Sequence, residues 1–148
     1  YQYSAAKIKL DLTADETLIQ PPIRIAVDHP YSDVNPDLFY AESYSFPELF
    51  SEKIRALGER LRPGARDLYD VINLFHQGLI NDPKTLKEIL RAKCEFKEIG
   101  LIYLADIEPK KEEFFRQWEQ QLSHQVSVLP PIESYWDHLP EFFEWLHS

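Results

Sequence analysis

The sequence predicts an α+β protein, with short strands near the N-terminus and helices over the rest of the chain. Residues 3–13 alternate between apolar and polar side chains, which is typical of a strand. Short strands are also predicted over 23–27 and 37–42. Beyond them, apolar residues recur at helical spacing. We therefore divide the chain into a strand region, 1–43, and a helical domain, 44–148.

Two helices are predicted on either side of Pro63-Gly64, which should end the first of them. Ser45 and Glu48 have the spacing of a capping box, and Pro47 lies in the first turn. The apolar faces of the two helices consist of Leu49, Phe50, Ile54, Leu57 and Leu61, then of Leu68, Val71, Ile72 and Phe75. The connection is so short that the helices should pack as an antiparallel hairpin.

Charged residues gather on this hairpin. Folding it back on itself at the turn places Arg60 opposite Asp67, and Lys53 within about one helical turn, roughly 5 Å, of the level of Asp70. From Lys53 to Arg66 there are five basic residues and one acidic residue, whereas the whole chain has 25 acidic and 16 basic residues. A local basic cluster in an acidic protein indicates an anion site, such as one for the phosphates of a nucleotide. Ordinary ion pairs between two solvated helices are the alternative.

Further helices are predicted along the chain. One begins with Pro83 at its first position. Residues 96–107 fit a helix interrupted at Gly100, another helix begins at Glu108-Pro109, and the last helix covers about 132–146. The three tryptophans fall in this last part of the chain: Trp118, Trp136 and Trp145. We interpret them as core residues, with a groove for a partner as the alternative.

The order of residues over 44–70 is distinctive. After Tyr44-Ser45 come, in this order, Glu52-Lys53, Ala56-Leu57, Arg60 and Arg66-Asp67-Leu68-Tyr69-Asp70. This order resembles the central motif of the AbiEii/AbiGii toxin family, which consists of nucleotidyltransferase-like proteins of bacterial type IV toxin–antitoxin and abortive-infection systems. The turn of residues 62–65 is longer than is usual in that family. The tryptophan-containing C-terminal end resembles the end of the same family.

The resemblance implies a fold and a set of functional residues. Residues 1–43 would complete a nucleotidyltransferase-like sheet, and Asp11 would be a metal ligand on a strand of that sheet. Lys53 would contact the triphosphate. The remaining site residues implied are Arg60 and Arg66 for nucleotide binding, and Asp67 and Asp70, which would position the nucleotide, hold Lys53 in place, or act as an acid/base pair.

The resemblance also implies ligands and partners. The intact protein would transfer a nucleotide from a nucleoside triphosphate (NTP), with Mg²⁺, to an acceptor, which is RNA and particularly tRNA for some members, and it would have a cognate antitoxin. The chain starts at Tyr1, has no Met, and lacks both the Gly-Gly or Gly-Ser turn and the Asp-x-Asp pair of such enzymes. We therefore expect a C-terminal fragment that is inactive alone.

Composition narrows the class of protein. A hydrophobic content of 44% is ample for a core, and a net charge of −9 argues against general binding of nucleic acid over the surface. The single Cys94 is expected in the core and suits a reducing compartment, so we expect a cytoplasmic protein without a membrane segment. Two non-enzymatic alternatives remain: a helical interaction module that binds an antitoxin or another protein, and a purely structural helical domain.

Overall fold

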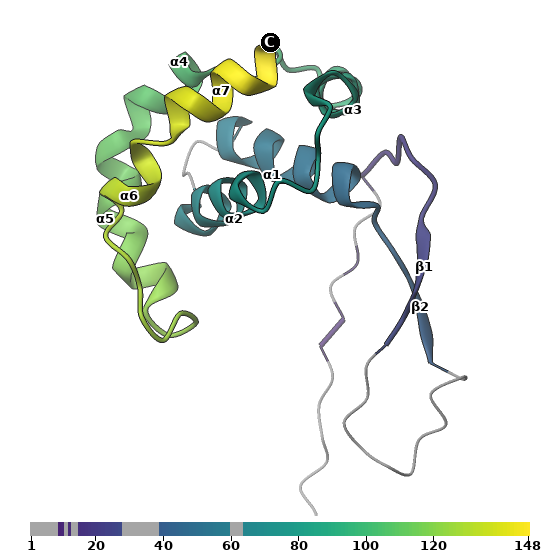
Figure 1. Cartoon of the computed structure of the whole chain (residues 1–148), viewed down its shortest axis with the longest axis horizontal. Helices are drawn as coiled ribbons and strands as arrows, with labels where there is room; N and C mark the ends of the chain where they lie inside the picture. The colour runs from purple at the N-terminus through teal and green to yellow at the C-terminus, as the bar shows by residue number, and fades with distance from the viewer. Residues whose placement is uncertain (1–8, 11, 13–14, 28–38, 60–63) are drawn as a thin grey trace, which may run out of the picture.

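The computed structural model describes residues 9–10, 12, 15–27, 39–59 and 64–148. It confirms the α+β architecture, with two strands followed by helices (Figure 1). The elements in chain order are β1 (Ile23–Ala26), β2 (Tyr40–Ser43), α1 (Phe46–Glu59), α2 (Ala65–His76), α3 (Pro83–Phe96), α4 (Leu104–Ile107), a 3-10 turn (Glu108–Lys110), α5 (Lys111–Leu122), α6 (Glu133–Trp136) and α7 (Leu139–His147).

The two strands form an antiparallel hairpin that extends away from the helices (Figure 1). Ile23 pairs with Ser43 and Ala26 with Tyr40. The strand predicted over 23–27 is confirmed, and β2 occupies part of the one predicted over 37–42. Of the strand predicted over 3–13, only residues 9–10 and 12 are described, and they are assigned to no strand.

The two helices of the predicted hairpin are confirmed. Phe50, Ile54 and Leu57 of α1 are buried, as are Leu68, Val71 and Ile72 of α2. Leu49 is the exception, because 38% of it is exposed although its spacing placed it on the apolar face. Leu61 lies outside the described residues.

The core lies where the helices meet. Helix α1 packs on α2 and α3, α2 packs on α5, and α3 packs on α7 (Figure 1). Trp118 and Trp136 are buried and Cys94 is 1% exposed, so the core interpretation is confirmed for these residues, whereas Trp145 is partly buried and packs against the core. Trp145 contacts Phe75 at a ring-centroid distance of 5.2 Å. In the described ranges, no helix is long and apolar enough to cross a membrane.

The prediction of a helix over 96–107 is wrong. Helix α3 ends at Phe96, and Glu98 adopts a φ of 55°. The amide of Ile99 donates to the carbonyl oxygen of Cys94, and that of Glu98 donates to the carbonyl oxygen of Glu95, both at 3.0 Å. These two bonds are a Schellman motif, which ends a helix. The chain then runs without helix until α4 begins at Leu104.

The last predicted helix is interrupted. Residues 132–146 contain α6 and α7, which are separated at Asp137 and His138. Pro140 lies in the first turn of α7, where its missing N–H costs nothing. In the interior of one continuous helix it would remove a hydrogen bond and its ring would collide with the preceding turn. The break therefore follows from Pro140.

Candidate functional site

Lys53 lies between two carboxylates of the neighbouring helix. Its Nζ, from the middle of α1, is 2.8 Å from Oδ2 of Asp70 and 3.5 Å from Oδ1 of Asp67, both on α2. The side chain of Asp67 is 6% exposed, whereas those of Lys53 and Asp70 are 32% and 39% exposed. The closeness of Lys53 and Asp70 that the short turn predicted is confirmed.

The two carboxylates keep Lys53 charged. Burial, the largest single effect, lowers the pKa of Lys53, but the hydrogen bonds and charges of Asp70 and Asp67 together raise it above its ordinary value. The ammonium is therefore retained at physiological pH. One cation beside two anions leaves a net negative charge, so these three side chains do not attract a phosphate unaided.

The other predicted site residues lie elsewhere or are not described. Arg66 is exposed on α2, and its Nε donates to the main-chain oxygen of Gln121 at 3.3 Å, which joins α2 to α5. In the part of the chain that the structure describes, no ion pair joins Arg66 to Asp70. Arg60 and Asp11 lie outside the described residues, so the proximity of Asp11 to Lys53 stays a prediction.

An open pocket of about 490 Å³ lies beside Lys53, between α1 and α2. Its charged side chains are those of Lys53 and Asp70. The other residues that line it are Leu49, Tyr69, Asn73, Leu74 and Gln77. The volume falls within the range of small-molecule sites in proteins. The sequence does not indicate this pocket, because the helical spacing of Leu49 predicts a core position.

A family model described as "Nucleotidyl transferase AbiEii toxin, Type IV TA system" matches residues 1–147, nearly the whole chain. The chain belongs to the AbiEii family. The resemblance seen in the residues of 44–70 is thereby confirmed, and the protein is a nucleotidyltransferase-like toxin of the type IV class, which implies an antitoxin as partner. No curated protein and no protein of solved structure matches the chain.

The described residues of this AbiEii family protein do not by themselves fit a magnesium ion. Within the described ranges, no group of three or more His, Cys, Asp or Glu side chains could hold a metal. Asp67 and Asp70 both face the ammonium of Lys53. Asp11, the ligand implied by the motif, is among the residues that are not described.

A second polar cluster of this AbiEii family protein, Glu48 with Lys93, is almost fully buried. Their side chains are 1% and 2% exposed, and Lys93 Nζ lies 2.7 Å from Glu48 Oε1. Lys93 also donates to the main-chain oxygen of Thr17 at 3.0 Å, while the Glu48 carboxylate accepts from the amides of Ile19 and Gln20 at 3.1 Å each. The pair therefore fixes residues 17–20 onto α1 and α3.

The role of Glu48 in this cluster corrects the prediction that Ser45 and Glu48 form a capping box. The sequence did not indicate the cluster itself. The amide of Glu48 donates to Ser45 Oγ at 3.3 Å, so one half of the box is present. The carboxylate of Glu48, however, accepts hydrogen bonds from the amides of residues 19–20 and forms an ion pair with Lys93. The spacing of Ser45 and Glu48 gave no signal for this role, because the partners lie far away in the chain.

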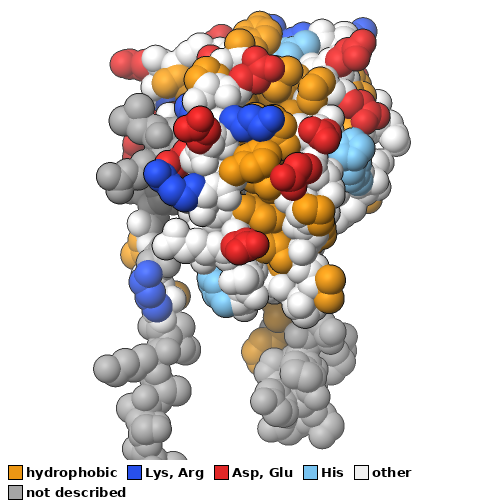
Figure 2. Space-filling model, turned by 90° about the vertical axis from the view of Figure 1, so that its left-hand side faces the viewer, with side chains coloured by type: hydrophobic (Ala, Val, Ile, Leu, Met, Phe, Trp, Pro, Cys, Tyr) orange, Lys and Arg blue, Asp and Glu red, His pale blue; other side chains and the backbone are white. Residues whose placement is uncertain are grey.

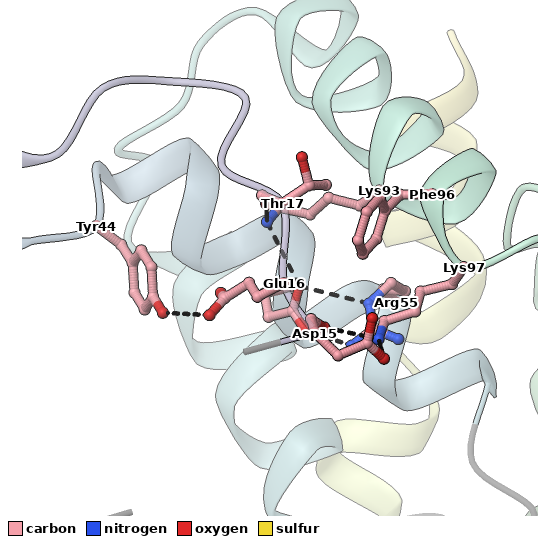
Figure 3. A pocket seen from close by; sticks show the side chains of 9 residues that line it. Asp15, Glu16, Thr17, Tyr44, Arg55, Lys93, Phe96 and Lys97 are labelled. Atoms are coloured by element: carbon pink, nitrogen blue, oxygen red, sulfur yellow. Dashed lines mark hydrogen bonds and ion pairs between the residues drawn. The ribbon is translucent and has the colours of Figure 1, made fainter. Parts of the chain in front are cut away.

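The pocket next to the buried pair has a volume of about 380 Å³ (Figure 3). Its cations already have partners: Lys97 pairs with Asp15 at 2.5 Å, Arg55 pairs with Glu52, and Lys93 pairs with Glu48. Figure 3 shows Tyr44 and Lys97 directed toward residues 15–16. The residues that line this pocket thus hold the segment before β1 in place. The pocket of Lys53 is the better candidate for a ligand.

Proposed function

We propose that the intact protein transfers a nucleotide from an NTP, with Mg²⁺, to an acceptor such as tRNA. In this proposal Lys53 contacts the triphosphate, and Asp67 and Asp70 hold its ammonium in position. Asp11 is the proposed metal ligand. The membership of the AbiEii family supports the reaction class. Arg60 and Arg66 remain candidates for further contacts with the nucleotide.

The observation that carries the proposal is the position of Lys53. Its ammonium is oriented by two carboxylates across a helix pair, it is partly exposed, and it borders a pocket of about 490 Å³. Side chains that are preorganised in this way lose little conformational entropy when a ligand binds. Lys93 also lines a pocket, but its side chain is 2% exposed, whereas that of Lys53 is 32% exposed and is accessible to a ligand.

Titration with NTP and Mg²⁺ tests the proposal on the protein expressed from its complete reading frame. We expect Lys53→Ala to weaken NTP binding by more than tenfold, about 1.4 kcal/mol, because the ammonium contacts the triphosphate. Isothermal calorimetry measures the affinity, and urea denaturation of the same variant measures its stability.

Lys84→Ala is the matched control, because Lys84 is an exposed lysine at the start of α3 and outside the pocket. It should leave NTP affinity unchanged. The structural alternative is correct if Lys53→Ala lowers stability while NTP affinity stays the same.

A second candidate function, binding of a protein partner, is favoured by a groove on another face. The groove has a volume of about 660 Å³ beside α5 and the segment before α6. Figure 2 views the side on which α4, α5 and α6 lie, and hydrophobic side chains form a band there with Asp and Glu on both sides. Leu129, Pro130 and Ile132 are among the residues that line the groove.

An interaction module would co-purify with the antitoxin and would not respond to NTP. We expect Leu129→Asp to abolish that co-purification if the groove is the interface, because it places a charge on an apolar contact. Normal co-purification of a folded Leu129→Asp protein would rule this groove out as the interface.

A further inference from the structure

The pocket beside Lys53 changes in character along its length. Lys53 and Asp70 form a charged end. Leu49 and Leu74 provide apolar side chains from the two helices, and Leu49 is 38% exposed although it is a leucine on a helix that packs into the core. Gln77, at the end of α2, supplies an amide. A nucleotide has the same three parts: anionic phosphates, a flat apolar base surface and a polar base edge.

The amides of the pocket differ in their availability. Asn73 Nδ2 donates to the main-chain oxygen of Tyr69 at 2.8 Å, and its Oδ1 accepts from the hydroxyl of Tyr135 at 3.4 Å. Gln77 is exposed, and its side chain makes no hydrogen bond with any residue that the structure describes. Gln77 therefore has both its donors and its acceptor available for a ligand.

The spacing suits a nucleotide that lies along α2. Asp70 and Gln77 are seven residues apart, which corresponds to roughly 10 Å along the helix axis. The phosphates therefore belong at Lys53 of α1, beside Asp70, and the base toward Gln77 at the C-terminal end of α2.

We propose that this pocket receives the nucleoside of the NTP, with the base between Leu49 and Leu74, and that the amide of Gln77 hydrogen-bonds to the base edge and sets the base preference. This inference rests on the proposed function, because it places the phosphates at Lys53. An amide that pairs with a base edge in two-point fashion discriminates against the wrong base.

Binding of the four NTPs and of inorganic tripolyphosphate, each with Mg²⁺, tests the proposal by isothermal calorimetry. Mg²⁺ is included because the carboxylates beside Lys53 disfavour a bare anion. The protein from its complete reading frame should prefer one base by about tenfold or more. Gln77→Ala should reduce this preference to about threefold or less, with tripolyphosphate affinity unchanged. Leu49→Ala should weaken all four NTPs and leave tripolyphosphate binding unchanged.

Gln125→Ala is the matched control, because Gln125 is exposed and outside the pocket. It should keep the full base preference. If tripolyphosphate and NTPs bind but Gln77→Ala keeps the preference of the unmodified protein, or if all NTPs bind no better than tripolyphosphate, this inference is overturned while the proposed function stands. If no triphosphate binds at all, the proposed function fails, and this inference fails with it.

Discussion

Two lysines of the helical part are held by carboxylates, and they differ in exposure. Lys93, 2% exposed, is enclosed by Glu48 at 2.7 Å and Glu52 at 3.5 Å. Lys53, 32% exposed, contacts Asp67 and Asp70 and lines a pocket together with Asp70. Lys53 is accessible to a ligand in the folded protein, whereas access to Lys93 would require the segment before β1 to move away. Exposure therefore separates the functional candidate from the structural one.

His147 gives the protein a predicted dependence on pH. Burial lowers the pKa of His147 below its ordinary value of 6.5, with a smaller lowering effect from Lys87, while its hydrogen bond to the oxygen of Ile102 partly opposes the shift. The unfolded chain therefore takes up this proton first as the pH falls. We expect stability to be fully present above about pH 6.5 and to decrease as the pH falls toward the pKa of the folded state. Urea denaturation at pH 7.5, 6.5 and 5.5 measures this.

His147→Gln should make that loss of stability smaller, because the group that titrates is gone. His124→Gln is the control, because His124 is exposed, and it should leave the loss as it is. An equal loss in the unmodified protein and in His147→Gln would contradict the prediction.

At this scale the sequence could predict the neighbours of Lys53 and not those of Lys93. Helical periodicity and a short turn determine which levels of two adjacent helices meet, so Asp70 could be placed near Lys53. Glu48 and Lys93 come from helices that are not consecutive in the chain. Their pairing depends on tertiary packing, which no local spacing encodes.

At the scale of elements, α1 lies very close to the segment before α4, at Gly58. A Cβ at Gly58 would lie 2.5 Å from Cγ2 of Ile102, which is buried. Alanine normally favours a helix over glycine by about 1 kcal/mol. Here we expect Gly58→Ala to lower the free energy of unfolding by about 1 kcal/mol or more, because the overpacking outweighs that gain. Urea denaturation measures the change.

Gly100→Ala is the matched control. A Cβ at Gly100 would meet no atom within 4 Å, and its φ is not positive. The same substitution there should be neutral or should raise the free energy of unfolding by up to about 1 kcal/mol. Equal effects at both glycines would show that the contact with Ile102 has no energetic weight.

At this scale the sequence was sufficient to predict where some helices begin, but not where α3 ends. The beginnings of α1 and α3 could be predicted from Ser45 and Pro83, because capping residues and prolines determine where a helix begins through neighbours in the sequence. The end of α3 could not be predicted, because Glu98 takes the left-handed conformation that usually marks a glycine. Because Gly100 is the glycine nearest this point, the sequence predicted the interruption there, whereas the helix ends before it, at Phe96.

For the whole molecule, the buried pair of Glu48 and Lys93 joins the N-terminal segment to the helices. We expect Lys93→Met alone to destabilise the protein by about 3 kcal/mol or more, because it leaves the Glu48 carboxylate buried without a cation. In the double variant Glu48→Gln/Lys93→Met the loss should be smaller than the sum of the single losses. Urea denaturation gives the energies.

Hydrogen exchange locates the effect of these variants. The amides of Ile19 and Gln20, which donate to Glu48, should exchange faster in the folded double variant, with those of α5 unchanged. Strict additivity of the two single losses, or unchanged exchange at Ile19 and Gln20, would show that the pair does not act as a unit.

The overall arrangement could be predicted only as a class. Apolar patterns predicted short strands followed by helices, and the family resemblance agreed. They could not specify that both strands of the hairpin are exposed, with Ile23 and Ile25 each 44% exposed. Alternation along a strand shows which side chains share a face, and it does not show what covers that face.

The placement of the tryptophans has a practical consequence for spectroscopy. Trp118, Trp136 and Trp145 lie on α5, α6 and α7, and none of them lines the pocket of Lys53. Intrinsic indole emission therefore follows the unfolding of the C-terminal helices, and it senses the pocket indirectly, through the contact of Trp118 with Tyr69. Occupancy of the pocket is better followed by calorimetry, or by a fluorophore attached through a cysteine introduced near it.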